Sequence, residues 1–567
     1  MPTFDFDSFL QPPPGLPIQY AFDFQLEHNA HYPILVHPNG GGLKYYNYSE
    51  VVPAIHRAGL SISTSIGFPI LQGGSSVPPV VAIVAETNNL TYLTVILGCL
   101  RAGITVLPIS PRFSSSVIAH LLRTAKATHV LISESMYNVT WKAIEDIKET
   151  SSHTPPGIVY MLTYQDLYLP SESGVLSTAF LPPHHPEFGK TQPSMILHSS
   201  SSTSLFPKLI PWSEQFLTSI SAIESAIPRF RGRTFGTQAT EFFHGAGLYF
   251  IFWACRVGLI LATMDPLNPQ TSIPAEEDLI FRNFEETRPA YIWASPRFIE
   301  IWATDPHKVR FMKTVDGVIF GGRFLNKRIG DKLVDEGVSI FTVYGSTECS
   351  YVSTFISEPQ GKDWEYFTLN PGVFTKLRHV ETSDMGSIHE LFVVSKPGLH
   401  ELPVTVWNAK WDWDPAYQSS DLVIEHPTKT GHYKILGRKG DQIMMSSGEV
   451  VYPIPIEDDI RYMAKFVKSA IVFGYSRPCL GVIIELHTPS EALNTEQSDI
   501  LCEVLEKINE NLPLYARISI KMVITASSQK PFPYGNKGVP RRPVILRAYD
   551  TEIYEAYALN NNYTKGV

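Results

Sequence analysis

Positive charge is scarce in this sequence, and long apolar runs are missing from it. Its 567 residues include 46 lysines and arginines against 55 aspartates and glutamates, which gives a formal net charge of −9. Without a basic stripe to neutralise phosphates, the chain is not expected to bind nucleic acid. No stretch of about 18 uncharged apolar residues occurs, so we expect no membrane-spanning helix and no membrane partner.

Cysteine is scarce as well. The five cysteines, Cys99, Cys255, Cys349, Cys479 and Cys502, are odd in number and widely scattered. This pattern is typical of buried free thiols in a reducing compartment and not of a disulfide framework. The acidic start of the chain, Met-Pro-Thr-Phe-Asp-Phe-Asp, lacks the layout of a signal peptide. We therefore expect a cytoplasmic protein.

Hydrophobic residues make up 44% of the chain, and this content over such a length predicts two or more domains with ample cores. Strands are expected at 80–85, 105–108 and 129–133, with helices between them at 90–102 and 115–125. This alternation predicts a parallel sheet with helices on both faces. We interpret residues 1–75 as an N-terminal lead-in and residues 150–190 as a loop region.

A run of hydroxylated residues follows the next apolar stretch. Ile196 and Leu197 lead through His198 into this run, and Pro207 and Lys208 come after it. Backbone N–H groups, hydroxyls and one cation are suitable partners for a polyphosphate, although the residue order of a Walker loop is absent. The candidate ligands are His198, Ser199, Ser200, Ser201, Ser202, Thr203, Ser204 and Lys208. The alternative is a flexible serine-rich linker.

Two glycine-containing segments follow. In the first, Glu241-Phe-Phe-His-Gly-Ala-Gly-Leu248, the histidine stands between aromatic residues and glycines, and a histidine in an apolar segment is usually a satisfied core residue. In the second, an expected strand from Val318 ends at Gly321 and Gly322. A glycine pair there is usually only a turn, but small residues also let backbone approach a ligand.

Two carboxylates follow β-rich segments further along. Phe341-Thr-Val-Tyr-Gly-Ser-Thr-Glu-Cys349 places Thr347 and Glu348 directly after a predicted strand, where a capped helix start is the alternative. Tyr417-Gln-Ser-Ser-Asp421 ends in a carboxylate that can accept two hydrogen bonds at once, although such a residue is often only a solvated turn aspartate.

The last two segments are basic and rich in glycine. Residues 433–457 include Gly437-Arg-Lys-Gly-Asp441, which as an isolated segment would be a polar hairpin. Residues 530–542, Lys-Pro-Phe-Pro-Tyr-Gly-Asn-Lys-Gly-Val-Pro-Arg-Arg, form a basic loop that would normally be a solvated surface.

Together and in this order, these segments resemble the motifs of the acyl-adenylate-forming superfamily, which includes acyl-CoA synthetases, adenylation domains of nonribosomal peptide synthetases, and luciferases. The resemblance extends from residue 99 to 542, and the Pro-Ile-Ser-Pro-Arg112 ending of residues 99–112 is most similar to adenylation domains of fungal carboxylic acid reductases. Ser201, Ser204 and Ser420 stand where the family usually has glycine, and Arg323 stands where relatives have a small residue.

The resemblance implies a role for each candidate residue. Lys537, Thr347 and Glu348 would be catalytic, with Glu348 as the Mg²⁺ ligand. Outside the serine-rich loop, the ATP- or AMP-binding residues would be Gly321, Gly322, Tyr344, Gly345, Ser346, Thr347, Asp421 and Arg438. The acyl pocket would be lined by Phe243, His244, Gly245, Ala294 and Arg323. Gly440 would be the hinge, since glycine absorbs large φ/ψ changes.

The resemblance also implies an α/β fold. A large N-terminal domain of packed α/β sheets would span residues 1–438, and a smaller mobile α+β domain would span 441–567, with the hinge at 437–440. In the smaller domain we expect helices at 458–465 and 496–511, strands at 467–475, 481–487 and 518–524, and a polar tail at 550–567.

The implied reaction converts a carboxylic acid and ATP·Mg²⁺ to acyl-AMP and pyrophosphate, followed by transfer to a thiol. The acceptor would be phosphopantetheine on the carrier domain of a carboxylic acid reductase. No acidic residue stands among the pocket positions to hold an α-amino group, which favours a small aryl or other non-amino acid. The alternatives are a free-standing acyl-CoA ligase using CoA, and a degenerate nucleotide-binding or scaffold protein, which the three serine replacements favour.

Overall fold

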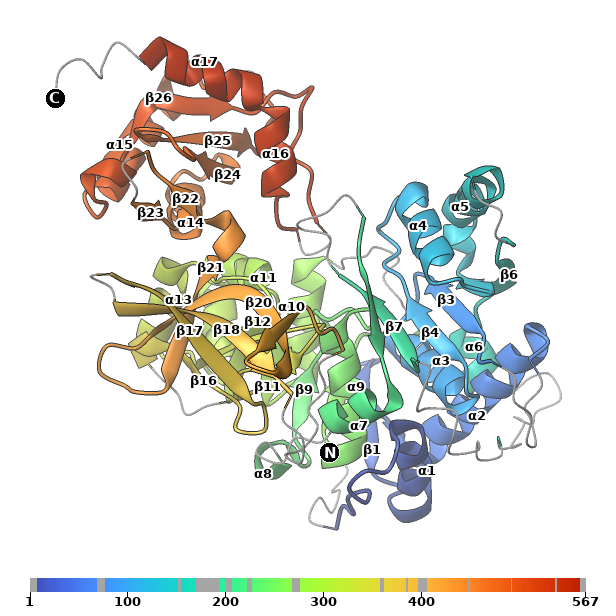
Figure 1. The fold of residues 1–567 in the computed structure, drawn as a ribbon. Coiled ribbons are helices and arrows are strands. Elements are labelled where there is room, and N and C mark those ends of the chain that lie inside the picture. The colour runs from blue at the N-terminus through green and yellow to red at the C-terminus, as the bar shows by residue number, and fades with distance from the viewer. Residues whose placement is uncertain are drawn as a thin grey trace.

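The computed structural model describes residues 8–68, 77–150, 154–169, 181, 193–199, 206–221, 227–267, 276–356, 361–383, 386–395, 405–446, 449–490, 492–535 and 538–560. Most of them form a large body, and the C-terminal elements form a smaller one above it in Figure 1. No helix among the described residues is both long and apolar enough to cross a membrane.

Two large sheets, parallel except at one end of each, form the framework of the larger body. The first has the order β13-β12-β11-β9-β10-β1-β2, with β1 at Pro33–Asn39, β2 at Gly42–Asn47, β9 at Thr234–Gly236, β10 at Ile260–Ala262, β11 at Tyr291–Trp293, β12 at Gly317–Gly321 and β13 at Ile340–Val343. The second has the order β6-β5-β3-β4-β7-β8, with β3 at Val80–Val84, β4 at Thr105–Pro108, β5 at His129–Ile132, β6 at Gly157–Tyr160, β7 at Met195–His198 and β8 at Leu209–Trp212. Strand order departs from chain order in both, as expected when helical crossovers connect parallel strands.

The helices of the larger body cover these sheets. They are α1 Ile18–His28, α2 Tyr48–Ser65, α3 Asn89–Arg101, α4 Ser115–Thr124, α5 Tyr137–Thr150, α6 Tyr164–Tyr168, α7 Glu214–Ser221, α8 Ile227–Phe230, α9 Gly245–Val257, α10 Glu277–Thr287, α11 Pro296–Trp302, α12 Pro306–Met312 and α13 Lys327–Asp335. The main core joins α2, α3 and α9 to residues of both sheets. Helices α2 and α3 cross closely at Gly59 and Gly98, where a Cβ on either would lie 2.6 to 2.8 Å from the partner's backbone.

A third, antiparallel sheet has the order β16-β21-β20-β18-β17, with β19 paired to β20. Its strands are β16 Phe367–Thr368, β17 Thr375–Ser383, β18 Gly386–Val394, β19 Ala409–Trp411, β20 Asp414–Glu425 and β21 His432–Arg438. A small hairpin of β14 Gly345–Ser346 and β15 Ser350–Tyr351 follows β13 directly. This hairpin carries the Tyr-Gly-Ser-Thr-Glu segment, so the alternative of a capped helix start does not hold.

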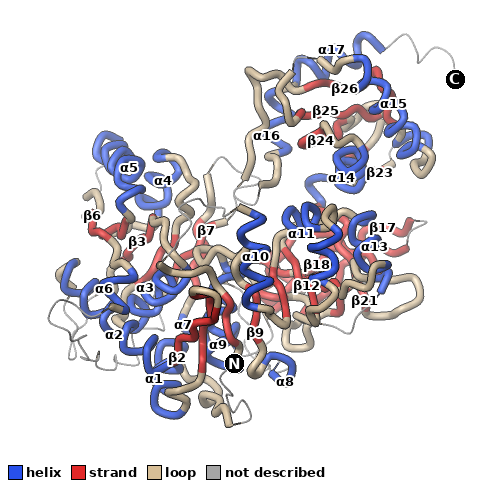
Figure 2. Tube along the Cα trace, turned by 180° about the vertical axis from the view of Figure 1, so that it is seen from behind, coloured by secondary structure: helices blue, strands red, loops and turns tan. Residues whose placement is uncertain are grey.

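The smaller body contains a sheet of β24 Val467–Phe473, β25 Leu480–Leu486 and β26 Ile518–Thr525, and a hairpin of β22 Ile443–Met444 and β23 Val450–Val451. Its helices are α14 Pro453–Met463, α15 Thr495–Asn509, α16 Arg542–Ala548 and α17 Asp550–Asn560. The views from the front and from behind both place α14 at the end of this body that faces α11 and α13 (Figures 1 and 2).

Several expected elements are confirmed, and four need correction. The expected elements between residues 80 and 133 coincide with β3, α3, β4, α4 and β5 to within a residue or two. Residues 1–75 are more than a lead-in, because β1 lies between β10 and β2 inside the first sheet. The region 150–190 contains β6 and α6, and the tail from residue 550 contains α17. Helix α14 begins five residues earlier than expected, at Pro453, a residue that favours the first position of a helix.

Candidate functional site

The serine-rich loop connects the two antiparallel strands of a hairpin. His198 at the end of β7 pairs with Leu209 at the start of β8. Ser199 N donates to the Lys208 carbonyl at 2.9 Å, and Lys208 N donates to Ser199 Oγ at 2.9 Å. The base of the loop is thus closed, and the Lys208 side chain is exposed. Residues Ser200, Ser201, Ser202, Thr203 and Ser204 lie outside the described residues.

His198 is a neutral, buried residue at the base of this loop. Its Nε2 accepts a hydrogen bond from Ser110 N at 3.4 Å, and its Nδ1 lies 3.2 Å from the Ser199 carbonyl oxygen. Burial, reinforced by the nearby His244, lowers the pKa of His198 to about 4. The ring therefore positions backbone in this structure and carries no charge for a phosphate near neutral pH.

His244 lies beside His198, with the two ring centroids 6.4 Å apart. Glu241 Oε2 lies 3.3 Å from His244 Nε2 and accepts a hydrogen bond from Arg112 Nη2. Burial opposes ionisation of Glu241, yet His244 and Arg112 hold its pKa below the ordinary value. The Arg112 guanidinium also lies over the Phe243 ring, 5.7 Å from its centroid. Phe243 and His244, which were predicted to line the acyl pocket, therefore belong to a polar cluster that includes the paired Glu241 carboxylate.

The roles of Arg112, Ser110 and Glu241 were not inferred from the sequence. A signal for Glu241 is its spacing of three residues from His244, which brings the two side chains together in the turn directly before α9. Arg112 and Ser110 belong to the Pro-Ile-Ser-Pro-Arg ending, but their partners come from distant strands and helices. Only the packed fold brings them together.

A second cluster joins the hairpin after β13 to the third sheet. The Tyr344 hydroxyl donates to Asp421 Oδ2 at 2.6 Å, and Arg438 Nε lies 3.3 Å from Asp421 Oδ1. Asp421 on β20 and Arg438 on β21 are direct cross-strand partners. Burial raises the pKa of Asp421 although Arg438 and Tyr344 favour the ionised form. Burial, together with the Asp421 charge, raises the pKa of Tyr344 well above its ordinary value, which keeps the phenol a donor.

The short β14–β15 hairpin fixes Thr347 and Glu348. A Cβ on Gly345 would clash with the Ser350 carbonyl oxygen and lie 3.0 Å from Tyr351 Cα, so only glycine fits. The Trp212 indole donates to the Thr347 carbonyl at 2.9 Å and thereby ties this hairpin to β8. Within the described ranges, no side chain pairs with the Glu348 carboxylate and no three acidic, histidine or cysteine residues gather as a metal site.

The glycine turn after β12 lies against the neighbouring strands. Gly321 is close to the Val343 carbonyl and the Trp293 ring, and Gly322 has a φ of +74°. Ala294 is fully buried after β11. Arg323, which follows this turn, has its charged neighbours in Glu300, Asp458 and Arg461 rather than in the cluster around His244.

The predicted catalytic lysine, Lys537, lies outside the described residues, and the residues on either side of it pair with each other. Gly535 N donates to the Val539 carbonyl at 2.9 Å, and Tyr534 forms a β-bridge with Pro540. The Tyr534 hydroxyl lies 2.7 Å from Ser469 Oγ and also donates to Glu485. These contacts hold the loop against β24 and β25.

The predicted hinge residue, Gly440, lies in a 3₁₀ turn at Lys439–Asp441. A Cβ there would meet no atom within 4 Å, and its φ is not in the left-handed region. Gly437, by contrast, has a φ of +140°. In this structure, the backbone conformation that requires glycine is therefore found at Gly437 and not at Gly440.

Comparison with known proteins places these features in a family. Residues 47–379 match the family "AMP-binding enzyme", and residues 440–561 match "AMP-binding enzyme C-terminal domain". The chain is 31% identical over 570 residues to the adenylate-forming reductase Nps10 of Heterobasidion annosum, with 97% of this chain and 50% of that protein covered. It is 25% identical to the carboxylic acid reductase of Neurospora crassa, with 91% of this chain and 48% of that protein covered. The chain thus spans about half the length of these curated relatives.

Two solved structures share the fold. The A-PCP didomain of carboxylic acid reductase from Segniliparus rugosus in complex with AMP has a TM-score of 0.69 at 15% identity, covering 98% of this chain and 84% of that one. ATP-bound MatB from Rhodopseudomonas palustris has a TM-score of 0.69 at 17% identity, covering 95% of this chain and 100% of that one. With more than half of its residues matched to one family and 98% of its length matched to one fold, this chain belongs to the AMP-binding enzymes, the adenylate-forming ANL superfamily.

Proposed function

We propose that this chain converts a carboxylic acid and ATP·Mg²⁺ to acyl-AMP and pyrophosphate. The observation that carries the proposal is the buried Asp421 carboxylate, held by the Tyr344 hydroxyl beside Arg438. A carboxylate can accept two hydroxyl donors at once, which suits the two hydroxyls of a ribose. Burial raises the pKa of Asp421, and a ligand that donates hydrogen bonds to this carboxylate would favour its ionised form.

The other candidate residues would bind the rest of the nucleotide. The closed loop between Ser199 and Lys208 would hold the phosphates through backbone N–H groups and the lysine, and Gly321 and Gly322 would let the nucleotide approach β12. Glu348, with no ion-pair partner in the described part of the chain, would be one oxygen ligand of Mg²⁺. Mg²⁺ usually takes its other ligands from substrate phosphates and water, and it would neutralise charge there.

Catalysis would need no covalent nucleophile. The substrate carboxylate would attack the α-phosphate in line with the departing pyrophosphate, and Thr347 and Lys537 would stabilise the charge that develops. A preorganised donor is useful here because it does not have to reorient during the reaction. The hairpin that holds Thr347 is closely packed, because a Cβ on Gly345 would clash with the Ser350 carbonyl oxygen.

The substrate we propose is a small aryl or other non-amino acid, in a pocket lined by Phe243, His244, Gly245, Ala294 and the glycine turn. Glu241 lies close to this pocket, but its charge is already compensated at Oε2 by Arg112, with His244 beside it. It therefore offers no uncompensated negative charge to an α-ammonium group. The aromatic ring of Phe243 would favour an aryl substrate.

The acyl acceptor we propose is the phosphopantetheine thiol of a carrier domain in a longer adenylate-forming reductase. The support is the kinship with such reductases, of which this chain spans about half. We place the boundary between a large domain, 1–438, and a small domain, 441–567, at the 437–440 segment. A cytoplasmic location is proposed because all five cysteines are free.

ATP–pyrophosphate exchange with a panel of aryl, aliphatic and amino acids tests the proposal. We expect exchange with a small aryl or other non-amino acid. The variant Asp421→Asn should weaken ATP binding by roughly 1.5–3 kcal/mol, the value of a hydrogen bond to a charged group. Preference for an amino acid would refute the substrate class. Acyl-CoA formation would favour a free-standing ligase, and absence of exchange with every acid would favour a scaffold protein.

A further inference from the structure

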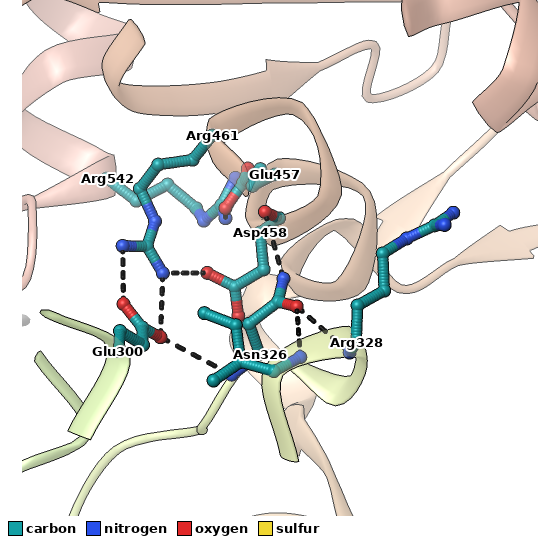
Figure 3. A network of polar contacts seen from close by, with 8 residues as sticks. Glu300, Asn326, Arg328, Glu457, Asp458, Arg461 and Arg542 are labelled. Atoms are coloured by element: carbon teal, nitrogen blue, oxygen red, sulfur yellow. Dashed lines mark hydrogen bonds and ion pairs between the residues drawn. The ribbon is translucent and has the colours of Figure 1, made fainter. Parts of the chain in front are cut away.

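A bidentate ion pair connects the two bodies of the molecule (Figure 3). Arg461 on α14 donates to Glu300 on α11 through Nη1 at 2.8 Å and Nη2 at 3.1 Å. Glu300 is 9% exposed, so this contact is largely shielded from water. Paired hydrogen bonds between a guanidinium and a carboxylate fix both distance and orientation, and shielding from water strengthens them.

Polar contacts around this pair strengthen the junction. Asn326, which caps α13, donates through Nδ2 to the Asp458 carbonyl at 3.2 Å, and its backbone N–H donates to Glu300 at 3.3 Å. Asp458 Oδ1 also accepts from Arg461 Nη2 at 3.2 Å. Arg328 and Asp459 form a more exposed pair at 3.3 Å. The middle of α14, from Asp458 to Arg461, is thereby attached to α11 and α13.

The same helix also holds the end of the Lys537 loop. Glu457, one helical turn before Arg461, accepts two hydrogen bonds from Arg542 Nη2, at 2.7 and 2.6 Å. Arg542 begins α16 directly after the loop, and its Nε lies 3.8 Å from Asp441 in the turn that contains Gly440. Residues one turn apart on a helix move together. A shift of Arg461 is therefore transmitted to both the loop and the turn.

Arg323 adds a repulsive charge at the junction. Its charged neighbours are two cations, Arg461 and Arg297, and two anions, Glu300 and Asp458. With Glu300 present, the opposite charges compensate. If Glu300 were neutralised, Arg323 and Arg461 would repel each other across the junction, since like charges in a shielded site are poorly screened.

We propose that the Glu300–Arg461 pair is a positioning device that docks α14 on the large domain and so places the Lys537 loop for adenylation. This inference rests on the proposed function. Glu300 and Arg461 act through α14, Glu457 and Arg542, and neither residue touches the substrates. Formation of acyl-AMP depends on the pair, and thiol transfer from preformed acyl-AMP does not.

The test compares the two half-reactions in Arg461→Met and in Glu300→Gln, which removes the negative charge of residue 300 but leaves Arg461 its contact with Asp458. Both variants should lower kcat for acyl-AMP formation about tenfold or more, with KM for ATP and acid changed less than twofold. Transfer from supplied acyl-AMP to the thiol acceptor should stay within twofold of the wild type. Arg461→Lys, which keeps the charge but loses the bidentate geometry, should recover part of the loss.

Arg233→Met is the matched control, because Arg233 pairs with Asp316 within the large domain. Both half-reactions should proceed at the wild-type rate in this variant. Equal loss of both half-reactions in Arg461→Met, or no loss in either, would overturn the positioning role while leaving the proposed function intact. A wild-type chain that forms no acyl-AMP with any acid would overturn both. A lower unfolding temperature with an unchanged ratio of the two half-reactions would assign the pair to stability alone and also refute positioning.

Discussion

Ser420 has a φ of +62°, in the left-handed region that glycine adopts readily and serine does not. It directly precedes Asp421 on β20 and stands where the family usually has glycine. The strain of an L-residue in this region is roughly 1–2 kcal/mol. The chain therefore keeps the backbone shape that positions Asp421, but at a cost in stability.

Replacing Ser420 by glycine should relieve this strain. Because glycine loses more backbone entropy on folding, by roughly 0.5–1 kcal/mol, the expected net gain in the free energy of unfolding is about 0.5–1 kcal/mol. Thermal unfolding of Ser420→Gly, compared with that of the wild type, measures this gain in stability. AMP affinity should not fall, because the backbone path to Asp421 is unchanged.

The neighbouring Ser419→Gly is the control, because the Ser419 hydroxyl donates to the Leu391 carbonyl at 2.9 Å and accepts from Asp421 N at 3.0 Å. That variant should be less stable than the wild type. If Ser420→Gly were destabilised to the same extent, the left-handed backbone at this position would not be strained.

Among the elements, the β14–β15 hairpin leaves no space for a larger residue at Gly345. Gly345→Ala would push the two strands apart, because its Cβ cannot fit beside the Ser350 carbonyl. Thr347 and Glu348 would move with the strands. We expect acyl-AMP formation to fall on the order of 10² or more, the scale for losing a preorganised stabilising group.

Gly440→Ala is the comparison, since a Cβ at that position meets nothing within 4 Å and the φ there suits any residue. Its rate of acyl-AMP formation, measured by the same exchange assay, should stay close to that of the wild type. Equal loss in both variants would indicate that flexibility at glycine, and not close approach at Gly345, governs the reaction.

At the scale of the whole molecule, the site is divided between two bodies. Tyr344, Thr347 and Asp421 belong to the larger one, and the Lys537 loop belongs to the smaller one, held against β24 and β25 through Tyr534. Lys537→Ala should lower acyl-AMP formation on the order of 10² or more. Thiol transfer from preformed acyl-AMP should continue at nearly the normal rate, because the lysine is proposed to leave the site before that step.

Rapid-quench measurement of each half-reaction separates these effects, with Lys530→Ala as the control in the same loop region. Lys530 pairs with Glu552 on α17, away from the loop tip. If Lys537→Ala slowed both half-reactions equally, the lysine would not be a mobile catalytic group.

Much of the fold was predictable because its signals are local. The β3–α3–β4–α4–β5 alternation is set by hydrophobic periodicity and turn residues within each segment, which act before any tertiary contact forms. The place of β1 was not predictable in the same way. Its partner β10 lies more than 200 residues further along the chain, with Leu35 opposite Leu261, and nothing in either short apolar segment specifies the other.

The same distinction between local signals and long-range contacts holds for the candidate site. The sequence by itself determined the family and which residues are candidates for the site, because Tyr344, Thr347, Glu348 and Asp421 stand in short segments whose order marks the family. Only the tertiary structure decided their partners: Glu241 with Arg112, Asp421 with Tyr344, and Glu300 with Arg461. These pairs join residues far apart in the chain, and their geometry depends on how sheets and helices pack, which side-chain identity in one segment cannot specify.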